Sequence, residues 1–109
     1  MAKSPIELSV NARDKLLSIL TEARKLLALP GNDYSWSSWQ GPDDALAELD
    51  ALIAAVHRGE IPKLTLKVMF APTGPMQEVS LSSGWAQGFL DLSSRFDAAL
   101  QELIGAEQC

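Results

Sequence analysis

Large apolar residues in the C-terminal third of the chain recur at a regular spacing of four and three. The series, with intervals of four, three, four, three and four, is Trp85, Phe89, Leu92, Phe96, Ala99 and Leu103. This spacing keeps the side chains on one side of an α-helix, so it predicts a helix over 84–104 whose apolar stripe must be buried. Ser82 or Ser83 is suited to cap its start, and Gly105 to end it.

Two further helices are predicted in the first half of the chain. Residues 10–29 carry apolar side chains at helical spacing, and Pro30 with Gly31 ends that helix. The second helix is predicted over 43–58, with Pro42 near its first position and Asp43 and Asp44 in its first turn, where the helix dipole favours negative charge.

The first residues allow two interpretations. Residues 6–10 alternate apolar and polar, which predicts an extended segment up to Leu8, with Ser9 or Asn11 capping the first helix. The competing signal is the sequence Ser-Pro-Ile-Glu from residue 4, which has the form of a capping box and favours an earlier helix start. Residues 5–9 are therefore left open between strand and helix.

The segments 63–70 and 75–82 are predicted to be the two strands of an antiparallel β-hairpin. Each alternates apolar and polar residues, and the turn sequence Ala-Pro-Thr-Gly lies between them. The register that places both apolar sets on one face sets Leu66 opposite Val79 and Leu64 opposite Leu81.

These elements predict a single α+β domain over residues 1–109, in the order α-α-β-β-α, with the hairpin packed against the helices. Connections between the predicted elements are short, apart from an aromatic loop at 30–42. Because an isolated two-stranded hairpin is marginal in water, the helices must cover it or its exposed edge must pair, which makes a homodimer compatible with the sequence.

Composition and charge exclude several classes of protein. A hydrophobic fraction of 47% with 21% charged residues is typical of a globular fold. The net charge of −5 disfavours binding to a nucleic-acid backbone and favours a basic partner. The chain has no apolar run long enough for a membrane span, and no secretion signal is recognised in it. We therefore expect a cytoplasmic protein without membrane contact.

The sequence predicts no catalytic residue, metal or cofactor. One cysteine, Cys109, and one histidine, His57, cannot build a Cys/His zinc cluster. His57 lies near a predicted helix end, and the serines before Gly84 do not match the G-x-S-x-G pattern of a nucleophile. Adjacent helical residues such as Asp43 and Asp44 point in different directions, so they do not form an acid/base pair. We therefore expect a protein that is not an enzyme.

The aromatic loop is the candidate functional segment. Residues 32–39 read Asn-Asp-Tyr-Ser-Trp-Ser-Ser-Trp and hold the one tyrosine and two of the three tryptophans of the chain. Tyr and Trp with nearby hydroxyl and carboxylate groups are typical of recognition surfaces. Either Trp36 and Trp39 fold under to pack on Trp85 and Phe89, or they remain exposed for a partner.

The sequence therefore favours a non-catalytic protein-interaction module that binds a basic protein partner through this loop, as an immunity protein or antitoxin does. The alternative is a small-ligand-binding protein with an aromatic cleft formed by Tyr34, Trp36, Trp39 and Trp85. The predicted binding residues are Asp33, Tyr34, Trp36, Ser37, Trp39 and Trp85.

Overall fold

A computed structural model describes the backbone of residues 5–108 and the side chains of residues 10–105. Within this range the chain forms five α-helices and no strand. They are α1 (Pro5–Leu27), α2 (Pro42–His57), α3 (Lys63–Met69), α4 (Pro75–Ser83) and α5 (Ala86–Gln108). The fold is therefore all-helical, and the predicted α+β class is wrong.

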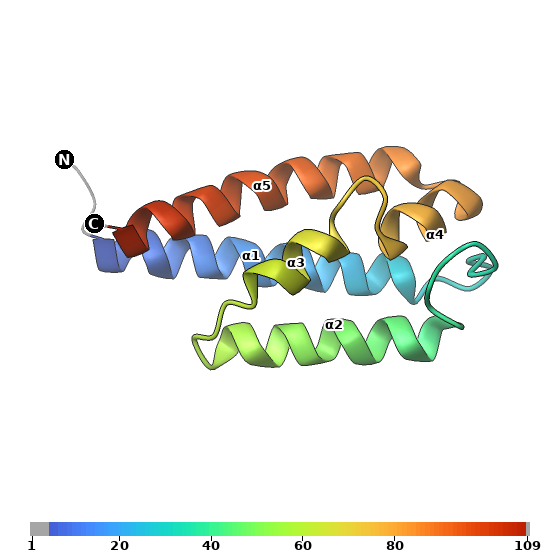
Figure 1. Cartoon of the computed structure of the whole chain (residues 1–109), viewed down its shortest axis with the longest axis horizontal. Helices are drawn as coiled ribbons and strands as arrows, with labels where there is room; N and C mark the ends of the chain where they lie inside the picture. Colours follow the sequence, from blue (N-terminus) through green and yellow to red (C-terminus); the bar gives the residue numbers. More distant parts are fainter. Residues whose placement is uncertain (1–4, 109) are drawn as a thin grey trace.

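The three long helices lie side by side, with α1 between α2 and α5 (Figure 1). Both neighbours run antiparallel to α1, and α3 and α4 lie across one face of this layer. The described part of the chain measures 47 × 25 × 20 Å along its principal axes. The loop between α1 and α2 lies at one end of the long axis, together with α4 and the start of α5.

The core forms where the apolar stripes of the long helices meet. From α1 it takes Ala12, Leu16, Ile19, Leu20, Ala23 and Leu27. From α5 it takes Phe89, Leu92, Phe96, Ala99, Leu100 and Leu103. The predicted apolar stripe of the last helix is thus confirmed from Phe89 onward, while Trp85 lies partly buried just before α5.

The helix ends differ from the prediction in several places. The first helix begins at Pro5, so the extended segment up to Leu8 is wrong, and the earlier start that Pro at the first helical position favoured is correct. Ser82 and Ser83 end α4 instead of capping the last helix, and Gly84 follows them in the left-handed conformation with φ of 85°. Gly105 does not end α5, which continues to Gln108.

The predicted hairpin strands 63–70 and 75–82 are instead the helices α3 and α4. Leu66 and Met69 of α3 and Phe70 directly after it are buried, and they follow the spacing i, i+3, i+4 of one helix face. On α4, Met76, Val79 and Ser80 repeat this spacing and are also buried. The pairing of Leu66 with Val79 and of Leu64 with Leu81 across a ladder therefore does not occur.

The short connection between α3 and α4 is folded tightly onto α3. Gly74 is the residue before α4, and a Cβ atom added there would lie 2.2 Å from the backbone oxygen of Val68. Phe70 stacks on Phe96 of α5 with ring centroids 4.3 Å apart, and the Ser93 hydroxyl donates a hydrogen bond to the Phe70 carbonyl. These contacts hold the connection against α5.

We expect Gly74→Ala to lower the free energy of unfolding by about 1–3 kcal/mol, because the methyl group overlaps a backbone oxygen that cannot move away freely. The matched control is Gly88→Ala on α5, where an added Cβ meets no atom within 4 Å. That control should raise stability by up to about 1 kcal/mol, because alanine favours helix. Urea unfolding followed by circular dichroism measures both changes, and equal stabilities for the two variants would contradict the close approach.

Candidate functional site

The loop of residues 28–41 joins α1 to α2 and is tied down at its base by Asn32. Its side-chain amide donates a hydrogen bond to the Leu26 carbonyl at 2.7 Å, and its amide oxygen accepts one from the indole N–H of Trp85 at 3.0 Å. The last carbonyls of an α-helix have no partner within the helix, so Asn32 satisfies one of them. It thereby connects the end of α1 to the start of α5.

Tyr34 satisfies a second carbonyl at the end of α1. Its hydroxyl donates to the Leu27 carbonyl, and its ring packs against the core as a partly buried side chain. Burial raises the pKa of the Tyr34 phenol above its usual value, and the nearby Asn32 side chain opposes this shift in part.

Asp33 joins the loop to α4 and closes a local turn. Its backbone N–H donates to the Ser83 hydroxyl at 2.9 Å, and its carboxylate accepts from the Ser35 N–H at 2.8 Å. The hydroxyl and backbone N–H of Ser35 hold the pKa of the Asp33 carboxyl below its usual value. Asp33 therefore stays ionised at neutral pH while it shapes the turn.

Trp36 lies at the tip of this turn. The Ser37 N–H donates to the Tyr34 carbonyl at 3.1 Å, which makes Ser35 and Trp36 the two central residues of a β-turn. The Ser37 hydroxyl donates to the Pro75 carbonyl at 3.3 Å, so the far side of the turn is attached to the start of α4. With both sides of the turn held, the Trp36 side chain is 74% exposed.

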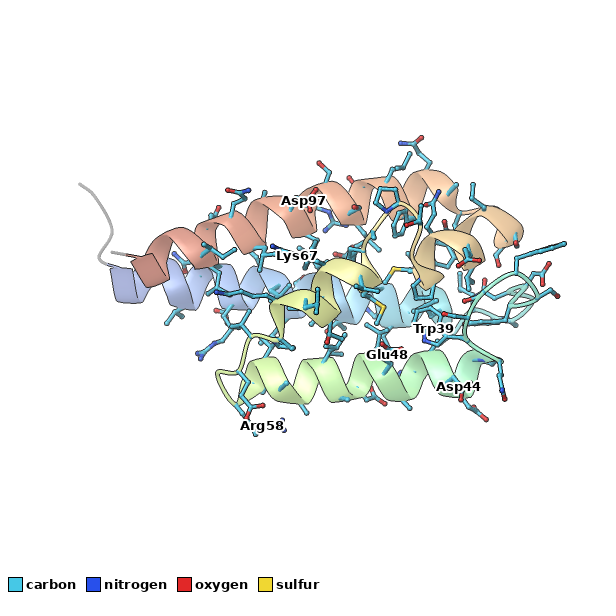
Figure 2. The ribbon with its side chains drawn as sticks, viewed as in Figure 1. Trp39, Asp44, Glu48, Arg58, Lys67 and Asp97 are labelled. Atoms are coloured by element: carbon cyan, nitrogen blue, oxygen red, sulfur yellow. The ribbon has the colours of Figure 1, made fainter. Side chains whose placement is uncertain are left out.

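Trp39 has the opposite environment, because its side chain is only 6% exposed and belongs to the core. Figure 2 shows Trp39 directed toward Glu48 of α2, whose carboxylate accepts the indole N–H at 2.6 Å. Asp44, near the start of α2, accepts from the Gln40 N–H at 3.0 Å. The sequence left open whether the two loop tryptophans are buried or exposed. In the structure Trp39 is buried and Trp36 is exposed.

The hollow over the loop is not lined by all of the predicted aromatic residues. This shallow hollow of about 590 Å³ is lined by residues that include Tyr34 and Trp39 but not Trp36 or Trp85. Trp85 instead packs partly buried against the core and holds Asn32. The six predicted binding residues thus divide into five that position the loop and one, Trp36, that it presents.

Charge is distributed unevenly along the molecule. Between Lys25 and Arg58 the sequence has no lysine or arginine but five acidic residues. They are Asp33, Asp43, Asp44, Glu48 and Asp50. From residue 68 to residue 94, which includes α4 and the start of α5, lysine and arginine are absent again. The end of the molecule that carries the loop is therefore acidic.

Sequence reasoning missed Asn32, Glu48 and Ser83, which hold the loop in place. Asn32 had a usable signal, because an Asn just after the Pro30–Gly31 helix stop is well placed to bond the free carbonyls of that helix. Glu48 and Ser83 carried no comparable signal, since each meets the loop only after α2 and α4 have packed beside it.

Among the side chains at 10–105, no three His, Cys, Asp or Glu residues come together in a way that would hold a metal ion. His57 lies exposed at the end of α2. None of the described helices is long and apolar enough to cross a membrane. No family model, curated protein sequence or solved structure matches the chain.

We expect Trp39→Phe to lower the free energy of unfolding by about 1–3 kcal/mol, because it leaves the Glu48 carboxylate without its donor and removes buried volume. Trp36→Phe should change stability by less than about 0.5 kcal/mol. Acrylamide should quench the wild-type fluorescence more than that of Trp36→Phe, in which the exposed indole is gone. Equal stability losses in the two variants would show that both indoles are structural.

Tyr34 should titrate above its ordinary pKa of about 10, because burial disfavours the phenolate. A raised pKa in the folded state means that this contribution to stability is present below about pH 10 and is lost as the pH rises through the folded-state value. The chain has one tyrosine, so ultraviolet absorbance of the phenolate follows this group alone. A midpoint identical in native protein and in urea would contradict the buried position.

Proposed function

We propose that this chain is a non-catalytic protein-interaction module that binds a basic protein partner through the loop between α1 and α2. The observation that carries the proposal is the exposure of Trp36, whose side chain is 74% accessible at the tip of a loop held on both sides. Exposure of a large indole surface to water is unfavourable. Tryptophan is also enriched among the anchor residues of protein interfaces.

The attachment of the loop supports binding without large reorganisation. Asn32, Tyr34 and Trp39 anchor it to α1 and α2, while Asp33 and Ser37 anchor it to α4. A loop that is already ordered loses less conformational entropy when a partner binds, so more of the contact energy appears as affinity.

The loop carries a second exposed apolar side chain besides Trp36. Leu29, two residues beyond the end of α1, is 47% exposed. The surrounding charge is negative, and Asp43 forms no hydrogen bond or ion pair with the described side chains. A basic partner would therefore meet an apolar centre with an acidic rim, which favours rapid association.

The small-ligand alternative receives less support. It needs four aromatic rings around one cavity, whereas Trp39 is buried, Trp85 bonds Asn32, and the hollow over the loop does not include Trp36.

The proposal also includes the cytoplasmic location that the sequence predicts. The partner to seek is therefore a cytoplasmic protein.

Affinity capture from extracts of the producing cells tests the proposal. Proteins retained by the wild type should be lost on Trp36→Ala, with an affinity at least about 30-fold weaker, because a central interface tryptophan contributes about 2 kcal/mol or more. Val10→Ala is the matched control, since Val10 is an exposed apolar residue on α1, far from the loop in sequence. It should retain the same proteins.

Asp43→Asn tests the charge of the partner separately. Removing this carboxylate should slow association and weaken its dependence on salt while leaving dissociation almost unchanged. Association measured by surface plasmon resonance at two ionic strengths reports both effects. Captured proteins that bind the Trp36→Ala variant as tightly as the wild type would refute the proposed site, and salt-independent binding would refute the basic partner.

A further inference from the structure

A second surface lies away from the loop, in a groove of about 440 Å³ between α3 and α5. Its floor contains the stacked rings of Phe70 and Phe96 together with Leu100. Lys67 of α3 and Asp97 of α5, both labelled in Figure 2, belong to its lining. The groove thus has an apolar floor, with a positive group from one helix and a negative group from the other.

The outer face of α3 forms an apolar ridge next to this groove. Leu64 and Val68 are one helical turn apart and are 78% and 52% exposed. The opposite face of α3 buries Leu66 and Met69 in the core. This short helix is therefore apolar on two faces, and the fold of one chain covers only one of them.

Lys67 and Asp97 have no ion-pair or hydrogen-bond partner among the side chains of residues 10–105. Their charged neighbours on α5 differ in this respect. Glu102 pairs with Lys15 of α1 at 2.9 Å, and Arg95 pairs with Glu22 of α1 at 2.6 Å. Lys67 and Asp97 are thus unpaired charges among the described side chains, and both line the groove beside the uncovered apolar ridge.

We propose that two copies of this chain pair through this surface about a two-fold axis. The ridge of Leu64 and Val68 from each copy lies in the groove of the other, and Lys67 of each copy pairs with Asp97 of the other. In a two-fold interface, residue i meets residue j and residue j meets residue i, so a ridge beside a groove and a positive charge beside a negative one are complementary to themselves.

The charges favour a second copy over other occupants. A purely acidic segment in this groove would face Asp97, and a purely basic one would face Lys67, so each leaves one unfavourable contact. A copy of the same surface rotated by half a turn brings the opposite charge to both positions. This surface is separate from the aromatic loop, so the inference does not depend on the proposed function.

Sedimentation velocity tests the pairing over about 1–100 µM, where interfaces of modest size associate and dissociate. The mass of the wild type should rise from 11.8 kDa toward twice this value. Leu64→Gln should weaken association at least about 10-fold, because it places a polar group on the ridge. Leu81→Gln is the control, because Leu81 is an exposed leucine on α4 that lies outside the groove, and it should leave association unchanged.

Charge reversal gives the decisive comparison. Lys67→Glu alone sets two carboxylates against each other at both contacts, and Asp97→Lys alone sets two ammonium groups together, so each variant should be monomeric. An equimolar mixture should form a dimer again, because each contact then joins a carboxylate from one variant to an ammonium group from the other. Circular dichroism of each variant verifies that its helices are intact.

Three results would overturn the inference. The first is a wild type that stays monomeric up to about 100 µM, the top of the range in which an interface of this size associates. The second is a mixture of Lys67→Glu and Asp97→Lys that remains monomeric while the wild type associates. The third is an equal loss of association in Leu64→Gln and Leu81→Gln.

Discussion

The packing of α1 between α2 and α5 is the constraint on which the rest of the molecule depends. Its side chains Leu16, Leu20 and Leu27 are completely buried, and both long neighbours contact it. Where α1 ends, its last carbonyls lack helical partners, and Asn32 and Tyr34 supply them. The position of the aromatic loop therefore follows from where a buried helix stops.

Trp36 and Trp39 are three residues apart but have opposite environments, because they make different contacts with the neighbouring helices. Trp39 lies where α2 presents Glu48 to its indole N–H, so both its apolar ring and its polar group are satisfied in the interior. Trp36 occupies the tip of a turn whose flanks, Asp33 and Ser37, bond to α4. Most of the predicted binding residues of the loop are therefore structural, and one, Trp36, is free for recognition.

The aromatic loop and the α3–α5 groove divide the surface into two regions of different charge. The loop region is acidic and presents an indole, whereas the groove has one charge of each sign beside an apolar ridge. An acidic rim suits a partner of opposite charge, while a balanced pair suits a copy of itself. Self-association and partner binding would then use separate surfaces and need not compete.

The sequence alone determined the three long helices and singled out the aromatic loop. Helical hydrogen bonds join residues four apart, so the spacing of apolar residues over the long segments around Leu20, Leu49 and Phe96 was enough to find α1, α2 and α5. The sequence of residues 82–105 predicted the ends of the last helix less well, because Gly105, the residue expected to end it, lies inside α5. Boundaries depend on contacts as well as on local preference.

Only the tertiary structure decided the state of residues 63–83 and the environments of the tryptophans. Over seven residues, Leu64, Leu66 and Val68 fit a strand, while Leu66, Met69 and Phe70 fit a helix equally well. The helix prevails because it buries Leu66, Met69 and Phe70 in the core of the three long helices, whereas a two-stranded hairpin leaves both edges unpaired. The burial of Trp39 likewise depends on Glu48, which reaches it only after α2 has packed against α1.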